Sequence, residues 1–130
     1  MTHRKPTRVL IVDDSPTVRM LLEHVLGADP AIQVAGCAAD GAEALRMALA
    51  LRPDVITMDL NMPRMDGVAA TAEIMRECPT PIVIVSGAAV PGEVSASFGA
   101  IEAGALVVAQ RPAAVGHPDH PAQAAALVRM

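Results

Sequence analysis

Short runs of consecutive apolar residues alternate along this chain with longer segments in which apolar residues recur every three or four positions. Runs of the first kind, rich in Val and Ile, are typical of strands buried on both faces of a sheet, and the second pattern is typical of helices that bury one face. Strands are predicted over residues 8–12, 32–38, 54–60, 81–86 and 105–109. Helices are predicted over 16–27, from a capping box at 40–43 to about 51, and over 67–78, 92–104 and 120–130.

The strict alternation of strand and helix predicts an α/β fold with a parallel sheet that is covered by helices on both faces. Right-handed crossovers leave few topologies for five strands, and we expect a doubly wound sheet in the order 2-1-3-4-5. Ligands of such sheets bind at the carboxyl ends of the strands, at the switch point between strands 1 and 3.

Polar residues whose side chains could bind a ligand or take part in a reaction lie at the ends of four of the predicted strands. Asp13 and Asp14 follow the first, Asp59 ends the third, Ser86 ends the fourth and Arg111 follows the fifth. Two carboxylates about 4 Å apart repel by roughly 1 kcal/mol in water, so their convergence favours a bound cation such as Mg²⁺. A carboxylate beside such an ion can attack a phosphoryl group and form an aspartyl phosphate. The hydroxyl and the guanidinium would contact the phosphoryl oxygens.

Each of these residues has an ordinary structural interpretation when it is taken alone. Acids, serines and prolines at strand ends commonly serve in turns and helix caps. Their joint placement at successive strand ends is what favours a shared site. Other candidates keep the ordinary interpretation: Cys37 and Cys78 are expected to be small buried groups, and the four histidines show no metal-ligand spacing.

Composition narrows the class of protein further. A length of 130 residues suits one domain, and a net charge of −4 argues against nucleic acid as a partner. The chain has no Trp or Tyr and one Phe, so it lacks the rings that usually stack on bases or flavins. No apolar run approaches the ~20 residues of a membrane span, and two cysteines fit a cytoplasmic protein without disulfides.

Four motifs resemble those of response-regulator receiver domains. They are VLIVDDS (9–15), DVITMDLNMPRMDG (54–67), PIVIVSG (81–87) and the Arg111-Pro112 pair. The resemblance covers nearly the whole chain and implies a flavodoxin-like receiver fold with Mg²⁺ as cofactor.

The resemblance also implies a role for each residue of the predicted site. Asp59 would be the phospho-acceptor, Asp14 would bind Mg²⁺ directly and Asp13 would bind it through water. Asn61 would add its backbone carbonyl, and Ser86 would be the hydroxyl that follows the phosphoryl group.

Two positions depart from the usual receiver pattern. Arg111 stands where receivers usually have a lysine that contacts the phosphoryl group, and Val108 stands where the family often has an aromatic residue. Arginine keeps the charge but is larger and planar.

Within receivers, the segments DDSPTVRMLL, LNMPRMDGVAAT and PTPIV most resemble the N-terminal domain of chemotaxis protein-glutamate methylesterases. This implies a receiver over residues 1–130 that ends within its last helix, with the methylesterase domain absent from the chain. A histidine kinase would phosphorylate the receiver, which would regulate the appended esterase. The fragment itself would carry only self-phosphorylation and dephosphorylation chemistry.

Three alternatives stay open from the sequence. The chain could be a free-standing receiver that acts as a protein-interaction module or a phosphate sink. An aspartyl-phosphate phosphatase is disfavoured because such enzymes generally need an acid two residues after the nucleophile, where this chain has Asn61. A flavin-binding electron carrier is disfavoured because the chain has no Ser/Thr-rich phosphate loop after the first strand.

Overall fold

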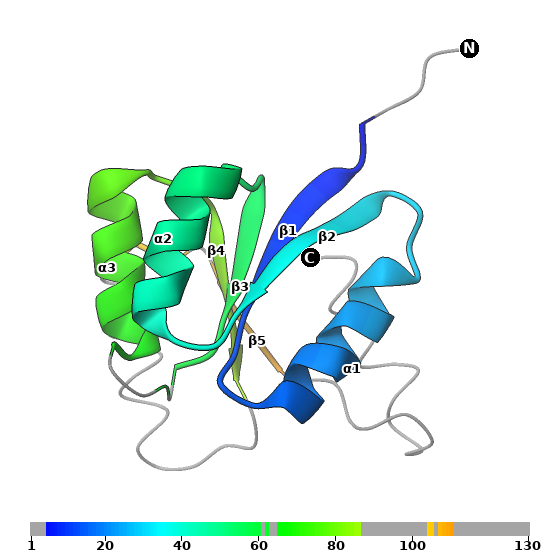
Figure 1. The fold of residues 1–130 in the computed structure, drawn as a ribbon, viewed down its shortest axis with the longest axis horizontal. Helices are drawn as coiled ribbons and strands as arrows, with labels where there is room; N and C mark the ends of the chain where they lie inside the picture. The colour runs from blue at the N-terminus through cyan, green and yellow to red at the C-terminus, as the bar shows by residue number, and fades with distance from the viewer. Residues whose placement is uncertain (1–4, 61, 63–64, 87–103, 106, 111–130) are drawn as a thin grey trace.

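A parallel sheet with helices on both faces forms the body of the molecule (Figure 1). The computed structural model describes residues 5–60, 62, 65–86, 104–105 and 107–110. The elements are β1 (Thr7–Val12), α1 (Pro16–Gly27), β2 (Ile32–Ala38), α2 (Gly41–Leu51), β3 (Val55–Met58), α3 (Gly67–Glu77), β4 (Ile82–Ser86) and β5 (Val107–Gln110). The helices predicted over 92–104 and 120–130 lie outside the described residues, apart from Gly104, which is in a turn.

The strands lie in the order β2-β1-β3-β4-β5, and every neighbouring pair is parallel. This is the order expected from the alternation of strands and helices. The prediction of a third strand over 54–60 was too long, because β3 ends at Met58. The amide of Asp59 still donates to the carbonyl of Val12 (2.9 Å), but the carbonyl of Leu60 accepts the amide of Gly67 (2.8 Å) and turns the chain toward α3.

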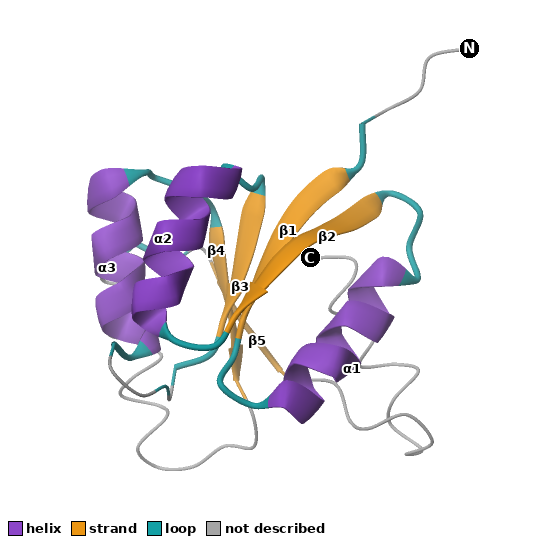
Figure 2. Cartoon of the chain, viewed as in Figure 1, coloured by secondary structure: helices purple, strands orange, loops and turns teal. Residues whose placement is uncertain are grey.

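Two apolar layers hold the helices against the sheet, with α2 and α3 on one face and α1 on the other (Figure 2). The first layer is centred on Leu10, Val12, Ile56, Met58, Ile74 and Ile84, and the second on Val9, Ile11, Leu22, Val25, Leu26 and Val85. Small buried residues of α2 and α3, among them Ala44, Ala48 and Ala70, allow these two helices to pack closely on the strands. None of the described helices is long and apolar enough to cross a membrane.

Each described helix begins with a side-chain cap, and the one at 40–43 was predicted from the sequence. Ser15 caps α1, and the carboxylates of Asp40 and Asp66 cap α2 and α3 by accepting amide hydrogen bonds of 2.8 Å each. In α2 the side chain of Glu43 accepts the amide of Ala39 (3.1 Å), one residue before the cap, so the arrangement is a variant of the predicted capping box. Such caps each stabilise a helix by about 1 kcal/mol, and they fix where α1 and α3 start relative to the strand ends.

Gly67 allows α3 to start directly against the segment that follows β3. A Cβ atom at Gly67 would meet the carbonyl oxygen of Asp59 and would lie 2.7 Å from the Cα of Leu60. These are backbone atoms, so the contact could be relieved only by moving the chain itself.

We expect Gly67→Ala to lower the free energy of unfolding by about 1–3 kcal/mol, because the added methyl group overpacks a site walled by backbone. The measurement is urea unfolding followed by circular dichroism. Gly27→Ala is the matched control: a Cβ there meets nothing within 4 Å, and replacing a helical glycine should leave the stability unchanged or raise it by about 0.5–1 kcal/mol. Equal effects of the two changes would contradict the role given to Gly67.

Candidate functional site

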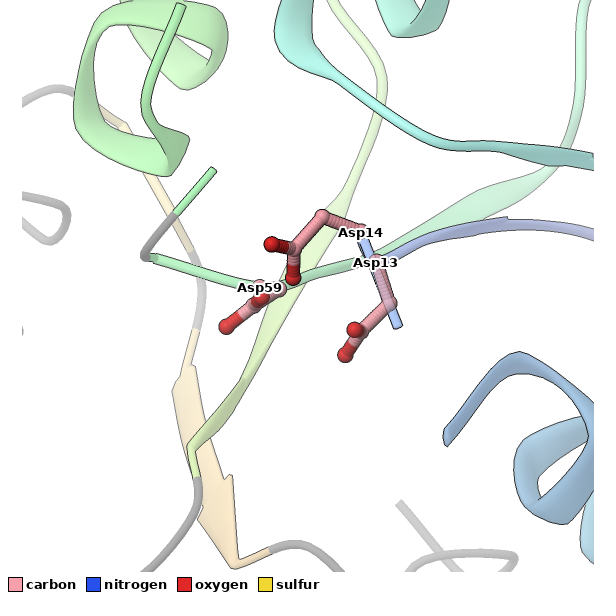
Figure 3. A group of neighbouring side chains, drawn as sticks. All are labelled: Asp13, Asp14 and Asp59. Carbon is pink, nitrogen blue, oxygen red and sulfur yellow. The ribbon is translucent and has the colours of Figure 1, made fainter. Parts of the chain in front are cut away.

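Three carboxylates meet at the carboxyl-terminal edge of the sheet, as the sequence predicts (Figure 3). They belong to Asp13, Asp14 and Asp59, and one oxygen of each lies within 4.8 Å of the others. Asp13 and Asp59 are almost fully buried, with 1% and 6% of their surface exposed, whereas Asp14 is exposed. The cluster therefore has a buried floor and an open side.

The sheet topology brings these acids together. β1 and β3 are neighbours, with Val12 opposite Met58, and each strand is followed at once by an acid. The amide of Asp13 donates to the carbonyl of Ala38 (3.0 Å), and that of Asp59 donates to the carbonyl of Val12 (2.9 Å). Because β1 lies between β2 and β3, the acids sit at the switch point where ligands of doubly wound sheets bind.

The loop between β1 and α1 is tied down by polar contacts around Asp13. One carboxylate oxygen of Asp13 accepts the amide of Ser15 (2.9 Å), and its backbone carbonyl accepts Nη1 of Arg19 (2.7 Å). The sequence did not single out Arg19. The only available signal was its place about one turn into a helix that starts beside the acids, which does not by itself give the direction of a side chain.

The donor set fits a small hard cation. Two oxygens on opposite sides of Mg²⁺ would be about 4 Å apart, since each Mg–O distance is about 2.1 Å. Carboxylate oxygens spread over as much as 4.8 Å suit an ion that some of the acids bind directly and another binds through water. A cation there would also offset the mutual repulsion of the three charges.

The other residues of the predicted site can be placed only in part. Ser86 is the last residue of β4, where its backbone pairs with Gln110 of β5, and β4 lies beside β3 at the same edge of the sheet. Val108 lies within β5 opposite Ile84. Asn61 and Arg111 lie outside the described residues.

The two cysteines show different surroundings. Cys78 is buried in the core, as predicted, whereas Cys37 is half-buried and its thiol donates to Oε1 of Glu23 (2.9 Å). Burial, followed by the hydrogen bond and the charge of Glu23, raises the pKa of Cys37 to about 12, and the charge of Arg19 opposes this shift. The Cys37 thiol is therefore neutral near pH 7 and is a poor nucleophile.

Comparison with known proteins agrees with this geometry. Residues 9–114 match the family model of the response regulator receiver domain. The chain is similar to the response regulator domain of Thermotoga maritima CheB, with 35% identity, a TM-score of 0.82 and coverage of 96% of this chain and 92% of that one.

The sheet topology and the acid cluster agree with the family match, and the chain belongs to the response regulator receiver family. It is 53% identical over 122 residues to a protein-glutamate methylesterase/protein-glutamine glutaminase of Nitrosospira multiformis, and equally identical over the same length to one of Syntrophus aciditrophicus. These matches cover 94% of this chain, which spans about a third of the length of those relatives (34% and 35%).

We expect Mg²⁺ to stabilise the folded protein, because the unfolded chain has no formed site. The gain should be about 1.4 kcal/mol at an Mg²⁺ concentration near ten times the dissociation constant, seen as a rise in melting temperature. Asp14→Asn should abolish the rise, and it should slightly raise the metal-free stability by removing a repelling charge. Glu77→Gln, which removes an exposed charge from the end of α3, should leave the metal effect intact. A melting temperature indifferent to Mg²⁺ in the wild-type protein would contradict the site.

We expect Glu23→Gln to lower the pKa of Cys37 from about 12 toward its usual value, since the change removes a negative charge that opposes the thiolate. The thiolate fraction at pH 8.5 should rise, and alkylation of Cys37 by iodoacetamide should become several-fold faster. Peptide mass spectrometry separates Cys37 from the buried Cys78. An unchanged rate would mean that burial alone sets the pKa.

Proposed function

We propose that Asp59 accepts a phosphoryl group from the phosphohistidine of a chemotaxis histidine kinase, and that the domain thereby regulates an appended protein-glutamate methylesterase. The observation that carries the proposal is the cluster of three carboxylates at the switch point of a receiver sheet. Mg²⁺ would be held by Asp13, Asp14, Asp59 and the backbone carbonyl of Asn61. When bound, it would neutralise charge on the phosphoryl oxygens.

The resemblance of residues 54–67 to the receiver motif supports Asp59, among the three acids, as the nucleophile. Its backbone amide is held by the end of β1 and Gly67 packs against its carbonyl, so its main chain is fixed. A carboxylate oxygen of Asp59 would form a bond to phosphorus while the N–P bond of the phosphohistidine breaks. The kinase imidazole keeps that electron pair and takes up a proton.

Ser86 and Arg111 would contact the phosphoryl group from the ends of the fourth and fifth strands. The Ser86 hydroxyl would donate to one phosphoryl oxygen, and the guanidinium of Arg111 could hold two oxygens at once, unlike the lysine usual at this position. With Val108 in place of an aromatic residue, the conformational response would be carried by less side-chain movement than is usual for the family.

The link to a methylesterase is supported by the names of the relatives and by the match to the CheB receiver. Regulation of a chemotaxis methylesterase would place the protein in the cytoplasm, where chemoreceptor tails and their kinases act. The alternative of a free-standing receiver that serves as an interaction module or phosphate sink differs only in what the phosphorylated domain controls.

We expect incubation with acetyl phosphate and Mg²⁺ to add one phosphoryl group, which intact mass spectrometry detects. Asp59→Asn should abolish the addition, and omission of Mg²⁺ should reduce it strongly. Asp54→Asn is a matched control, because Asp54 is an exposed acid at the opposite end of the same strand, where it accepts the amide of Arg8 (2.8 Å).

Phosphorylation that persists in Asp59→Asn would show a different acceptor. Absence of phosphorylation in the wild-type protein, by acetyl phosphate and by a phosphorylated chemotaxis kinase alike, would overturn the proposed function.

A further inference from the structure

We infer that Arg19 is a positioning residue for cation binding: its guanidinium holds the peptide that joins Asp13 to Asp14 and so orients the exposed acid of the cluster. The inference rests on the proposed function, because it concerns the affinity of the acid cluster for Mg²⁺. It assigns a role to a residue outside the cluster itself.

The inference rests on one hydrogen bond between the side chain of Arg19 and the backbone of Asp13. Nη1 of Arg19 lies 2.7 Å from the backbone carbonyl oxygen of Asp13, six residues earlier in the chain. Arg19 is itself fixed in α1, where its amide donates to the carbonyl of Ser15 (2.9 Å). The bond therefore ties the loop to the first turns of the helix that follows it.

That carbonyl belongs to the peptide group between Asp13 and Asp14. A peptide group is planar, so fixing its oxygen fixes the orientation of the following amide and restricts the direction in which the Asp14 side chain leaves the chain. The amide of Ser15, bonded to the Asp13 carboxylate (2.9 Å), restrains the other side of Asp14. The most exposed acid of the cluster is thus held between two restrained peptide groups.

Two effects of the Arg19 side chain act in opposite directions on a bound cation. Its positive charge repels the cation, so removing the charge alone would tighten Mg²⁺ binding. Its hydrogen bond prearranges a ligand, so removing the bond would weaken binding. The sign of the change in affinity therefore shows which effect dominates.

The test is isothermal titration calorimetry of Mg²⁺ with the unphosphorylated protein. We expect Arg19→Met to weaken Mg²⁺ binding about tenfold, the low end of what loss of a ligand-orienting residue typically causes. Arg19→Lys keeps a charged donor and should stay within about threefold of the wild type. Arg76→Met is the matched control, because it removes an exposed arginine near the far end of α3 and should leave the affinity unchanged.

Arg19→Ala is a second neutral variant, since alanine favours the helix at this position if methionine perturbs it. A readout without metal accompanies the titration: amide hydrogen exchange of Ser15 in the metal-free protein should become faster in both neutral variants but not in Arg19→Lys.

Unchanged or tighter Mg²⁺ binding in the neutral variants, with binding retained by the wild type, would overturn the role of Arg19 and leave the proposed function intact. Unchanged exchange of Ser15 would overturn it as well. Failure of the wild-type protein to bind Mg²⁺ would instead overturn the proposed function, and this inference with it.

Discussion

The parallel pairing of β1 with β3 is the constraint on which the site depends. Each strand is followed immediately by an acid, so pairing in register with Val12 opposite Met58 forces like charges together. Two charges 4 Å apart repel by about 4 kcal/mol at an effective dielectric near 20. A shift of the strands to relieve this repulsion would disrupt the side-chain packing of both apolar layers. The buried strands thus hold the three carboxylates close together, and a bound cation would offset their repulsion.

Residues of α1 and α3 help to fix the backbone segments that carry the three acids. Gly67 lets α3 begin against the backbone of Asp59, and Ser15 starts α1 directly after the paired acids. Arg19 returns from α1 to the carbonyl of Asp13. Side chains and backbone together hold the acid-bearing segments that leave the two strands, which is the preorganisation that a small cation with strict geometry requires.

Much of the fold could be predicted because local signals and burial agree. The apolar spacing over 16–27 predicted the observed bounds of α1, and the apolar run at 32–38 predicted those of β2. The convergence of the acids followed from strand order alone. The end of the third strand was misjudged because the apolar residues continue to Leu60, whereas the carbonyl of Leu60 bonds the amide of Gly67 in the following turn and not a neighbouring strand.

The contacts of individual side chains could not be predicted from the sequence. The spacing of Arg19 is that of any helical arginine, and nothing in the pattern shows that it turns back to the strand end. Cys37 looks like a small apolar group in sequence, yet it donates to Glu23 across the α1–β2 boundary. Such contacts depend on rotamers and on the distance between elements, which periodicity does not encode.

The most direct test of the account is a crystal structure of the protein soaked with Mn²⁺, which replaces Mg²⁺ and is located by its anomalous scattering. The account predicts one ion within the carboxylates of Asp13, Asp14 and Asp59, with Asp14 and Asp59 bound directly and Asp13 through water. An anomalous peak elsewhere on the molecule, or three acids that turn away from one another with no ion between them, would contradict it.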